Sequence, residues 1–398
     1  MATNERTSAS AATGAEVGAG SSLRKDVEAL ARLRRLTTTA GERRSAEWVA
    51  NRLRELDTEN VRIVTFRGQS SWAWAHGAHL LAGLAASWVR GRTGRLLGTL
   101  VAVSYELDVS TRNQWLRRLM PGRQGYSVEA HIPSREPAWR TLVLVAHHDA
   151  AHSGLIWHPI ANAANQRRSA HTGRALPSHA APLIGLAAAA TGSRYLRVPA
   201  RLLLAISTLL FGQAALSRTV PGANDNASGV AAVLELVRRL KERPLPGVDI
   251  VIVSPGGEEA GSVGMRAWMR GPGKSLDRQS TLVVNLDAIG SGGHLIVSRR
   301  EGLTGWFRRG DVDLSQRGAR VAGLAPPRVV TFPNVTDAFV ARRAGLRAVS
   351  ILSYDEGWIS NLHRPSDVPA SVAWSTVDQA IKLTEGTVEA WMATERRH

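Results

Sequence analysis

The spacing of apolar residues changes along the chain and divides it into predicted elements. Helical spacing comes first, in LRKDVEALARLRRL and ERRSAEWVANRLREL, and a short strand, NVRIVTF, follows at 60–66. Two more strands are predicted in YSVEAHI and TLVLVAHHD. After Pro221, helices and strands alternate through ASGVAAVLELVRRL, VDIVIVSP, the segment after GGEEAGSVG, STLVVNLD, DAFVARRAG and LRAVSIL. Continuous apolar strands that alternate with helices are typical of a mainly parallel sheet covered on both faces, so we predict α/β architecture.

Two apolar insertions, at about 68–123 and 155–220, interrupt this alternation. Each contains two apolar stretches around a basic turn. In 72–107 the stretches WAHGAHLLAGLAASWV and LLGTLVAV flank RGRTGR, and in 178–217 the stretches APLIGLAAAATG and LLLAISTLLFGQAAL flank SRYLRVPAR. We expect each insertion to form an apolar helical hairpin within one large domain at 22–398.

These insertions allow two interpretations. Most of the stretches are shorter than the roughly 20 residues that span a bilayer, which favours a buried helical subdomain or a dimer interface. Tryptophans and basic turns beside apolar helices favour association with an anionic membrane surface. If the hairpins span the bilayer, the turns are expected in the cytoplasm and the opposite edge of the domain on the other side. The residues concerned are Trp72, Trp74, Trp88, Arg90, Arg92, Arg95, Arg194, Arg197 and Arg201.

The amino-acid composition limits which metal ligands and which partners the chain can have. The chain has no cysteine, so any metal must be bound by His, Asp or Glu and no disulfide can form. The net charge of +17 comes almost entirely from scattered arginines and no nucleic-acid motif accompanies it, so we expect no nucleic-acid partner. Residues 1–21 are small and polar without an apolar core, which predicts a disordered tail and no recognisable signal peptide. Without membrane association, a cytoplasmic protein is expected.

Ionisable side chains follow the ends of the predicted strands, where open parallel sheets bind ligands. His147 and Asp149 point to one side of their strand and His148 to the other, because side chains alternate. We therefore predict His147 as a metal ligand, Asp149 as the carboxylate that fixes its other ring nitrogen, and His148 and His152 as structural. Carboxylates gathered at one edge repel one another unless a cation neutralises them. The groups expected at this edge are His147, Asp225, Glu258, Glu259, Asp287 and His363.

Five motifs in order resemble the co-catalytic zinc aminopeptidases, a family that includes aminopeptidase Y, glutamate carboxypeptidase type enzymes and the glutaminyl cyclases. They are HHD at 147–149, PGANDNASGVAAVLEL at 221–236, GGEEAGSVG at 256–264, NLDAIG at 285–290 and HRPSD at 363–367. The resemblance covers about 22–395 apart from the insertions. It implies a three-layer α/β/α zinc-peptidase fold with a mainly parallel mixed sheet.

The resemblance also implies a site with two Zn²⁺ ions. Asp225 would bridge them, His147 and Asp287 would complete one ion, and Glu259 and His363 the other. Such an enzyme hydrolyses a peptide or amide through a metal-bound hydroxide, with Glu258 as general base and Asp149 as a supporting catalytic group.

Three further features come from the same likeness. The bond joining Asp225 to Asn226 is expected to be cis, and Thr336 and Asp337 are expected near the metal ligands. Arg364 departs from the family, which usually has a small hydroxyl residue after the histidine, so substrate contacts there are expected to differ.

An aminopeptidase-type exopeptidase is the function that these residues favour. A glutaminyl cyclase, which commonly uses one zinc, and a non-catalytic module like the transferrin-receptor ectodomain are the alternatives. The complete ligand set argues against both. The choice between aminopeptidase, carboxypeptidase and amidohydrolase activity stays open at this stage.

Overall fold

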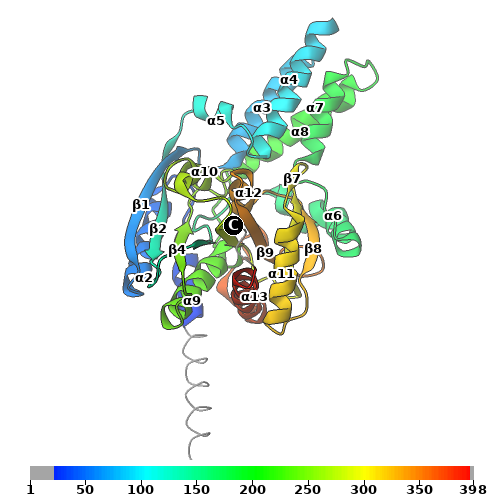
Figure 1. The fold of residues 1–398 in the computed structure, drawn as a ribbon. Coiled ribbons are helices and arrows are strands. Elements are labelled where there is room, and N and C mark those ends of the chain that lie inside the picture. The colour runs from blue at the N-terminus through cyan, green and yellow to red at the C-terminus, as the bar shows by residue number, and fades with distance from the viewer. Residues whose placement is uncertain (1–21, 395–398) are drawn as a thin grey trace, which may run out of the picture.

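The computed structural model describes residues 22–394, so the tail predicted at 1–21 lies outside the described residues. These residues form one sheet of nine strands, in the order β1-β2-β4-β3-β5-β9-β6-β7, with β8 paired to β6 (Figure 1). The strands are β1 (Glu59–Gly68), β2 (Arg123–Ile132), β3 (Arg140–Val145), β4 (Val248–Ser254), β5 (Thr281–Leu286), β6 (His294–Glu301), β7 (Gly305–Trp306), β8 (Arg328–Phe332) and β9 (Arg347–Tyr354).

The sheet is parallel at its centre and mixed towards its edges, where β8 pairs with β6 in parallel and the other outer pairs are antiparallel. Strands β4, β3, β5 and β9 are parallel neighbours, and every residue of β5 is buried. Continuous apolar sequences such as TLVVNL suit strands covered on both faces. The antiparallel pairs are β1 with β2, β2 with β4, β6 with β9 and β6 with β7. The predicted α/β fold with a mixed sheet is confirmed.

Helices flank the sheet and bury one large core against it (Figure 1). A helix at 22–31 was predicted to be longer, because LRKDVEALARLRRL keeps helical spacing to residue 36. The others around the sheet are α2 (Ala40–Glu55), α9 (Gly229–Glu242), α10 (Val263–Arg270), α11 (Arg309–Val321), α12 (Asp337–Arg343) and α13 (Trp374–Met392). Short elements complete this part: α5 (Trp115–Leu119), α6 (Pro159–Thr172), η1 (Leu155–Trp157), η2 (Ala223–Ser228), η3 (Pro272–Ser275) and η4 (Pro369–Ser371).

Four helices from the two insertions form a bundle that projects from the body of the molecule (Figure 1). They are α3 (Trp72–Ala86), α4 (Gly91–Val109), α7 (Ala180–Ala190) and α8 (Arg197–Ala215). Helix α3 packs on α4 and α8, and α7 packs on α4 and α8. The core of the bundle contains Leu80, Leu186 and Leu204, all fully buried, together with Phe211.

The outer surface of the bundle is unusually apolar. Among the described residues, α8 is the one helix whose length and composition would allow it to cross a membrane. Eight large exposed apolar side chains lie in 72–109 and eight in 180–216, which is 16 of the 25 found among the described residues. They include Trp88, Leu202 and Leu209.

Candidate metal centre

Four neighbouring strands deliver five of the predicted side chains to one edge of the sheet. His147 follows the end of β3 and Asp287 directly follows β5. Glu258 and Glu259 lie in the loop after β4, and His363 lies beyond the end of β9. Because these strands are parallel neighbours, their carboxyl ends meet at this edge.

Asp225, in η2, lies between the two histidines. Its Oδ1 is 3.3 Å from Nε2 of His147, and its Oδ2 is 3.1 Å from Nε2 of His363. Nε2 of His147 lies 3.6 Å from Oδ1 of Asp287, and Nε2 of His363 lies 3.1 Å from Oε2 of Glu259. Two groups of three potential metal ligands therefore share Asp225, and within each group the ligand atoms lie within 4.8 Å of one another.

The chemistry and burial of these five side chains fit divalent metal ions such as zinc. All five offer an imidazole nitrogen or a carboxylate oxygen, which zinc accepts in the absence of cysteine. None is more than 7% exposed. Oε1 of Glu259 is buried without a hydrogen-bond partner among the described residues, which suits a group with a ligand outside the protein.

Asp149 is fully buried and connects several parts of the site. Its Oδ1 lies 3.4 Å from Nδ1 of His147, the ring nitrogen that faces away from the other ligands. The backbone N–H groups of Glu258 and Glu259 donate to its two oxygens, and the hydroxyl of Thr37 donates to Oδ2 at 2.6 Å. The orientation of His147 is thus coupled to the loop that carries the two glutamates.

Two residues that the sequence did not single out hold the backbone beside Asp225. Arg35 is fully buried and its Nη2 donates to the carbonyl of Gly222 at 2.5 Å. Asp367 accepts from the N–H groups of Asn224 and Asp225 at 2.7 and 3.0 Å. The HRPSD motif contains Asp367, whereas an arginine within a helical pattern is normally expected at the surface.

The peptide bond between Asp225 and Asn226 is cis, as predicted. The side chain of Asn226 donates to the carbonyl of Leu286 and accepts from the N–H groups of Gly229 and Ala288. These bonds join η2 to the end of β5, which Asp287 directly follows.

Burial and charge shift the proton affinities of the site in opposite directions. Burial raises the pKa of Glu258 well above its ordinary value, and burial raises that of Glu259 to about 7. Burial alone would lower the pKa of His363, but Glu259 and Asp225 raise it to about 10. Burial would raise the pKa of Asp225, yet His147 and His363 hold it below its ordinary value. The imidazoles therefore neutralise the carboxylates, a role that metal ions can replace.

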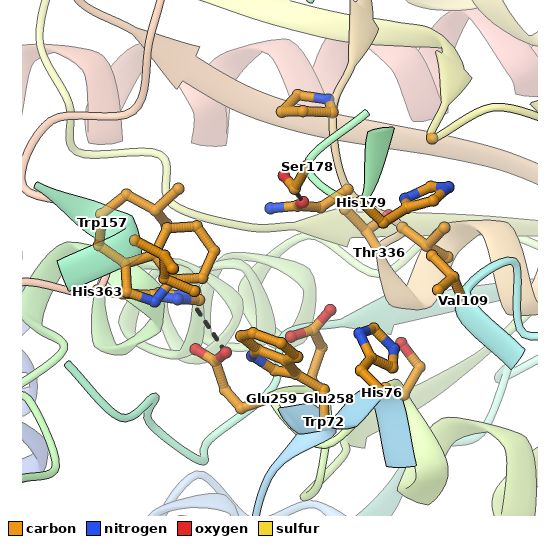
Figure 2. Close-up of a pocket in the computed structure, with 18 of the residues that line it drawn as sticks. Trp72, His76, Val109, Trp157, Ser178, His179, Glu258, Glu259, Thr336 and His363 are labelled. Carbon is orange, nitrogen blue, oxygen red and sulfur yellow. Dashed lines mark hydrogen bonds and ion pairs between the residues drawn. The ribbon is translucent and has the colours of Figure 1, made fainter. Parts of the chain in front are cut away.

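A cavity of about 270 Å³ opens onto this centre. Figure 2 shows Glu258, Glu259 and His363 facing the space, with His179 and Thr336 across from them. Among the described residues that line the cavity, Arg117 is the one lysine or arginine, and its Nη2 lies 2.7 Å from Oδ1 of Asp108.

The remaining predicted residues lie around this centre. Nδ1 of His148 lies 3.1 Å from the carbonyl of Ser254, and burial lowers the pKa of His148 to about 4. Nδ1 of His152 lies 2.6 Å from the carbonyl of Ser217. Both rings therefore contact backbone.

Thr336 and Asp337 differ in their surroundings. Thr336 lines the cavity and its hydroxyl donates to Glu301 at 2.9 Å. Asp337 is fully buried, and burial raises its pKa to about 7. Arg364 does not line the cavity, so direct substrate contact through its side chain there is not supported.

A comparison with known protein families finds a match in the second half of the chain. Residues 209–388, which include most of the predicted ligands, match the model of peptidase family M28. The match covers 180 of the 398 residues of the chain. The M28 segment begins near the end of α8, so His147 and most of the bundle precede it.

A curated protein is also similar to part of the chain. The chain is 28% identical over 173 residues to the alkaline phosphatase isozyme conversion protein of Escherichia coli, which is 40% of this chain and 50% of that protein. The match thus spans about half the length of that relative.

Solved structures share the fold of the M28 segment and of the strands before it. An aminopeptidase from Aneurinibacillus superposes with a TM-score of 0.55 at 14% identity, covering 93% of both chains. A zinc aminopeptidase from Bacillus subtilis has a TM-score of 0.54 at 14% identity, covering 96% of this chain and 95% of that one. The glutaminyl cyclase of Fimbriiglobus ruber has a TM-score of 0.54 at 16% identity, covering 93% and 95%.

Proposed function

We propose that this protein is a zinc-dependent metallopeptidase of the aminopeptidase type with two metal ions in its site. The observation that carries the proposal is Asp225, whose two oxygens face two different histidines. His147 and Asp287 would bind one ion with it, and Glu259 and His363 the other. The short distances among these side chains and the match of residues 209–388 to peptidase family M28 support the proposal.

The side chains around the metals would have different roles in hydrolysis. Bound zinc ions would polarise the scissile carbonyl and stabilise negative charge in the transition state. Glu258 would take a proton from the attacking water and pass it to the leaving amine, and burial, which raises its pKa, favours a group that can hold this proton. Asp149 would keep the ring of His147 in the orientation and tautomer that metal binding needs.

Among the described residues that line the cavity, no unpaired lysine or arginine is available for a free carboxylate of the substrate. The one guanidinium, on Arg117, is already paired with Asp108. A carboxypeptidase would need an available cation for the substrate carboxylate. Removal of an amino-terminal residue is therefore the activity that we propose.

Metal analysis of the purified protein, combined with a substrate screen, tests this function. We expect close to two zinc ions per chain and hydrolysis of peptides with a free amino terminus, with N-acetylated peptides left intact. Full activity with one equivalent of metal would contradict the two-metal site. Conversion of amino-terminal glutamine to its cyclic form without hydrolysis would favour the cyclase alternative.

We also propose that the bundle attaches the enzyme to anionic membranes. Its apolar outer surface supports this, as do the exposed arginines Arg90 and Arg194 at the turns between its helices and Arg92 and Arg95 at the start of α4. Apolar side chains would enter the bilayer while the arginines contact acidic headgroups. A helical subdomain or a dimer interface remains the competing interpretation, and the two differ in whether the protein binds lipid vesicles.

A further inference from the structure

All four helices of the bundle contribute residues to the cavity at the metal centre. Among the helices of the bundle, only the last turns of α8 lie within the M28 segment, which starts at residue 209. Most of this part of the cavity therefore lies outside the segment that matches family M28. The residues are Trp72 and His76 from α3, Asp108 and Val109 from α4, Ala181 and Pro182 from α7, and Ser207, Leu210 and Phe211 from α8.

Large aromatic rings connect the bundle to the metal site. The ring of Trp72 lies edge-on to Phe211, with centroids 4.9 Å apart, and edge-on to Trp157 at 6.3 Å. Trp157, in η1 of the second insertion, lies edge-on to the predicted ligand His363 at 4.2 Å (Figure 2). An apolar wall made by the insertions thus begins directly beside the place where the scissile bond would lie.

The charged groups on the bundle side of the cavity are already paired. Arg117 binds Asp108 through Nη2 at 2.7 Å, and Nε2 of His179 lies 2.9 Å from Oε2 of Glu106. These pairs leave no free charge on this side that would select a charged side chain. An uncharged apolar side chain would lose its water shell there at no electrostatic cost.

We propose that the bundle forms the pocket for the amino-terminal side chain of the substrate, and that this pocket selects large apolar residues such as leucine and phenylalanine. This proposal rests on the aminopeptidase function proposed above. It assigns the two insertions a role in substrate choice, separate from any contact with a membrane.

The ratio of kcat/KM for leucine p-nitroanilide to kcat/KM for alanine p-nitroanilide measures this pocket. We expect the unmodified full-length protein to favour the leucyl substrate. Phe211→Ala and Trp72→Ala should each lower the ratio roughly tenfold, because an apolar pocket that loses contact with a side chain loses discrimination of this size. Ala181→Phe places a larger side chain in the pocket and reduces its free volume, so it should lower leucyl hydrolysis while alanyl hydrolysis persists.

Trp74→Ala is the matched control, because Trp74 lies on the same helix as Trp72 and is 41% exposed on the outer surface. It should leave the ratio at the unmodified value. Melting temperature and zinc content identify any variant that fails to fold, and Ala181→Phe then decides, since Ala181 is exposed within the cavity.

The outcomes separate this proposal from the function on which it rests. If no substrate with a free amino terminus is hydrolysed, the aminopeptidase function is wrong, and the proposed specificity pocket is wrong as well. If both anilides are cleaved equally well, or if folded pocket variants keep the original ratio, the enzyme is an aminopeptidase whose specificity does not come from the bundle.

Discussion

Adjacent residues in the loop after β4 have different surroundings. Oε2 of Glu259 lies 3.1 Å from His363, within one group of potential ligands, whereas Glu258 lines the cavity outside both groups. Both N–H groups donate to Asp149, so the loop fixes the two side chains together. The two glutamates therefore share a backbone anchor, and we propose that they have separate tasks.

Glutamine substitutions should separate these tasks. Glu258→Gln should retain normal zinc content while turnover falls by about 10²- to 10⁴-fold, because the group that moves the proton is lost. Glu259→Gln should lower zinc occupancy, because a carboxylate ligand is lost. Metal analysis and kcat measured on the same preparations check this. Identical behaviour of the two variants would contradict the division of roles.

Much of this site could be predicted from sequence because its residues follow recognisable strands. His147 and Asp287 come directly after apolar runs. Their separation along the chain does not show that they lie close together in space, but the parallel order of the strands predicts it. Arg35 and Thr37 could not be predicted, because no local pattern distinguishes an arginine that caps a distant backbone from one exposed to water. Their roles depend on tertiary contacts with Gly222 and Asp149.

Among the helices and strands, several that make long-range contacts were not predicted from the sequence. The central strands were predicted because they are apolar throughout, whereas β6 is an outer strand whose sequence HLIVSRRE ends in charges. Helix α11 and strand β8 were also not predicted, and their contacts with α13 and β6 are long-range. Strand β7 has only two residues, which is too short for a recognisable pattern. Periodicity shows that an element exists, but it does not identify its partner.

Helix contacts in the bundle depend on small residues. A Cβ atom on Gly98 of α4 would lie 2.9 Å from the backbone Cα of Ala190, at the end of α7, whereas a Cβ on Gly77 of α3 would meet nothing within 4 Å. The two positions thus offer a matched pair, in which the same substitution meets a crowded contact or open space.

Gly98→Ala and Gly77→Ala should change stability in opposite directions. Each gains about 1 kcal/mol of helix propensity. At Gly98, overpacking costs about 1–3 kcal/mol, which should outweigh that gain and lower the stability of the bundle. Thermal unfolding of both variants under the same conditions measures the difference. Equal stabilisation by both substitutions would show that α4 and α7 do not pack as closely as described.

For the whole molecule, the bundle has two surfaces with separate proposed roles. Its base lines the cavity beside His363, while its flanks expose apolar side chains and its turns expose arginines. A bilayer that covered the flanks would leave the sheet edge with the metal ligands in water, because that edge belongs to the body from which the bundle projects (Figure 1). Membrane attachment and catalysis are therefore compatible in one chain.

Vesicle flotation with charge variants tests the membrane proposal at this scale. The full-length protein should float with vesicles that contain phosphatidylglycerol and bind less to vesicles of phosphatidylcholine alone, because each arginine near an anionic surface contributes about 1 kcal/mol. Arg90→Glu combined with Arg92→Glu should abolish this preference. The control, Arg309→Glu combined with Arg320→Glu, makes the same change of charge at exposed positions on α11 and should float normally.

An apolar contribution is tested by Leu202→Asp combined with Leu209→Asp. The control is Val321→Asp on α11, and all three positions are exposed leucine or valine residues. Recovery of the unmodified protein as a soluble dimer that binds neither kind of vesicle would instead assign the apolar flanks to contact between two copies of this chain.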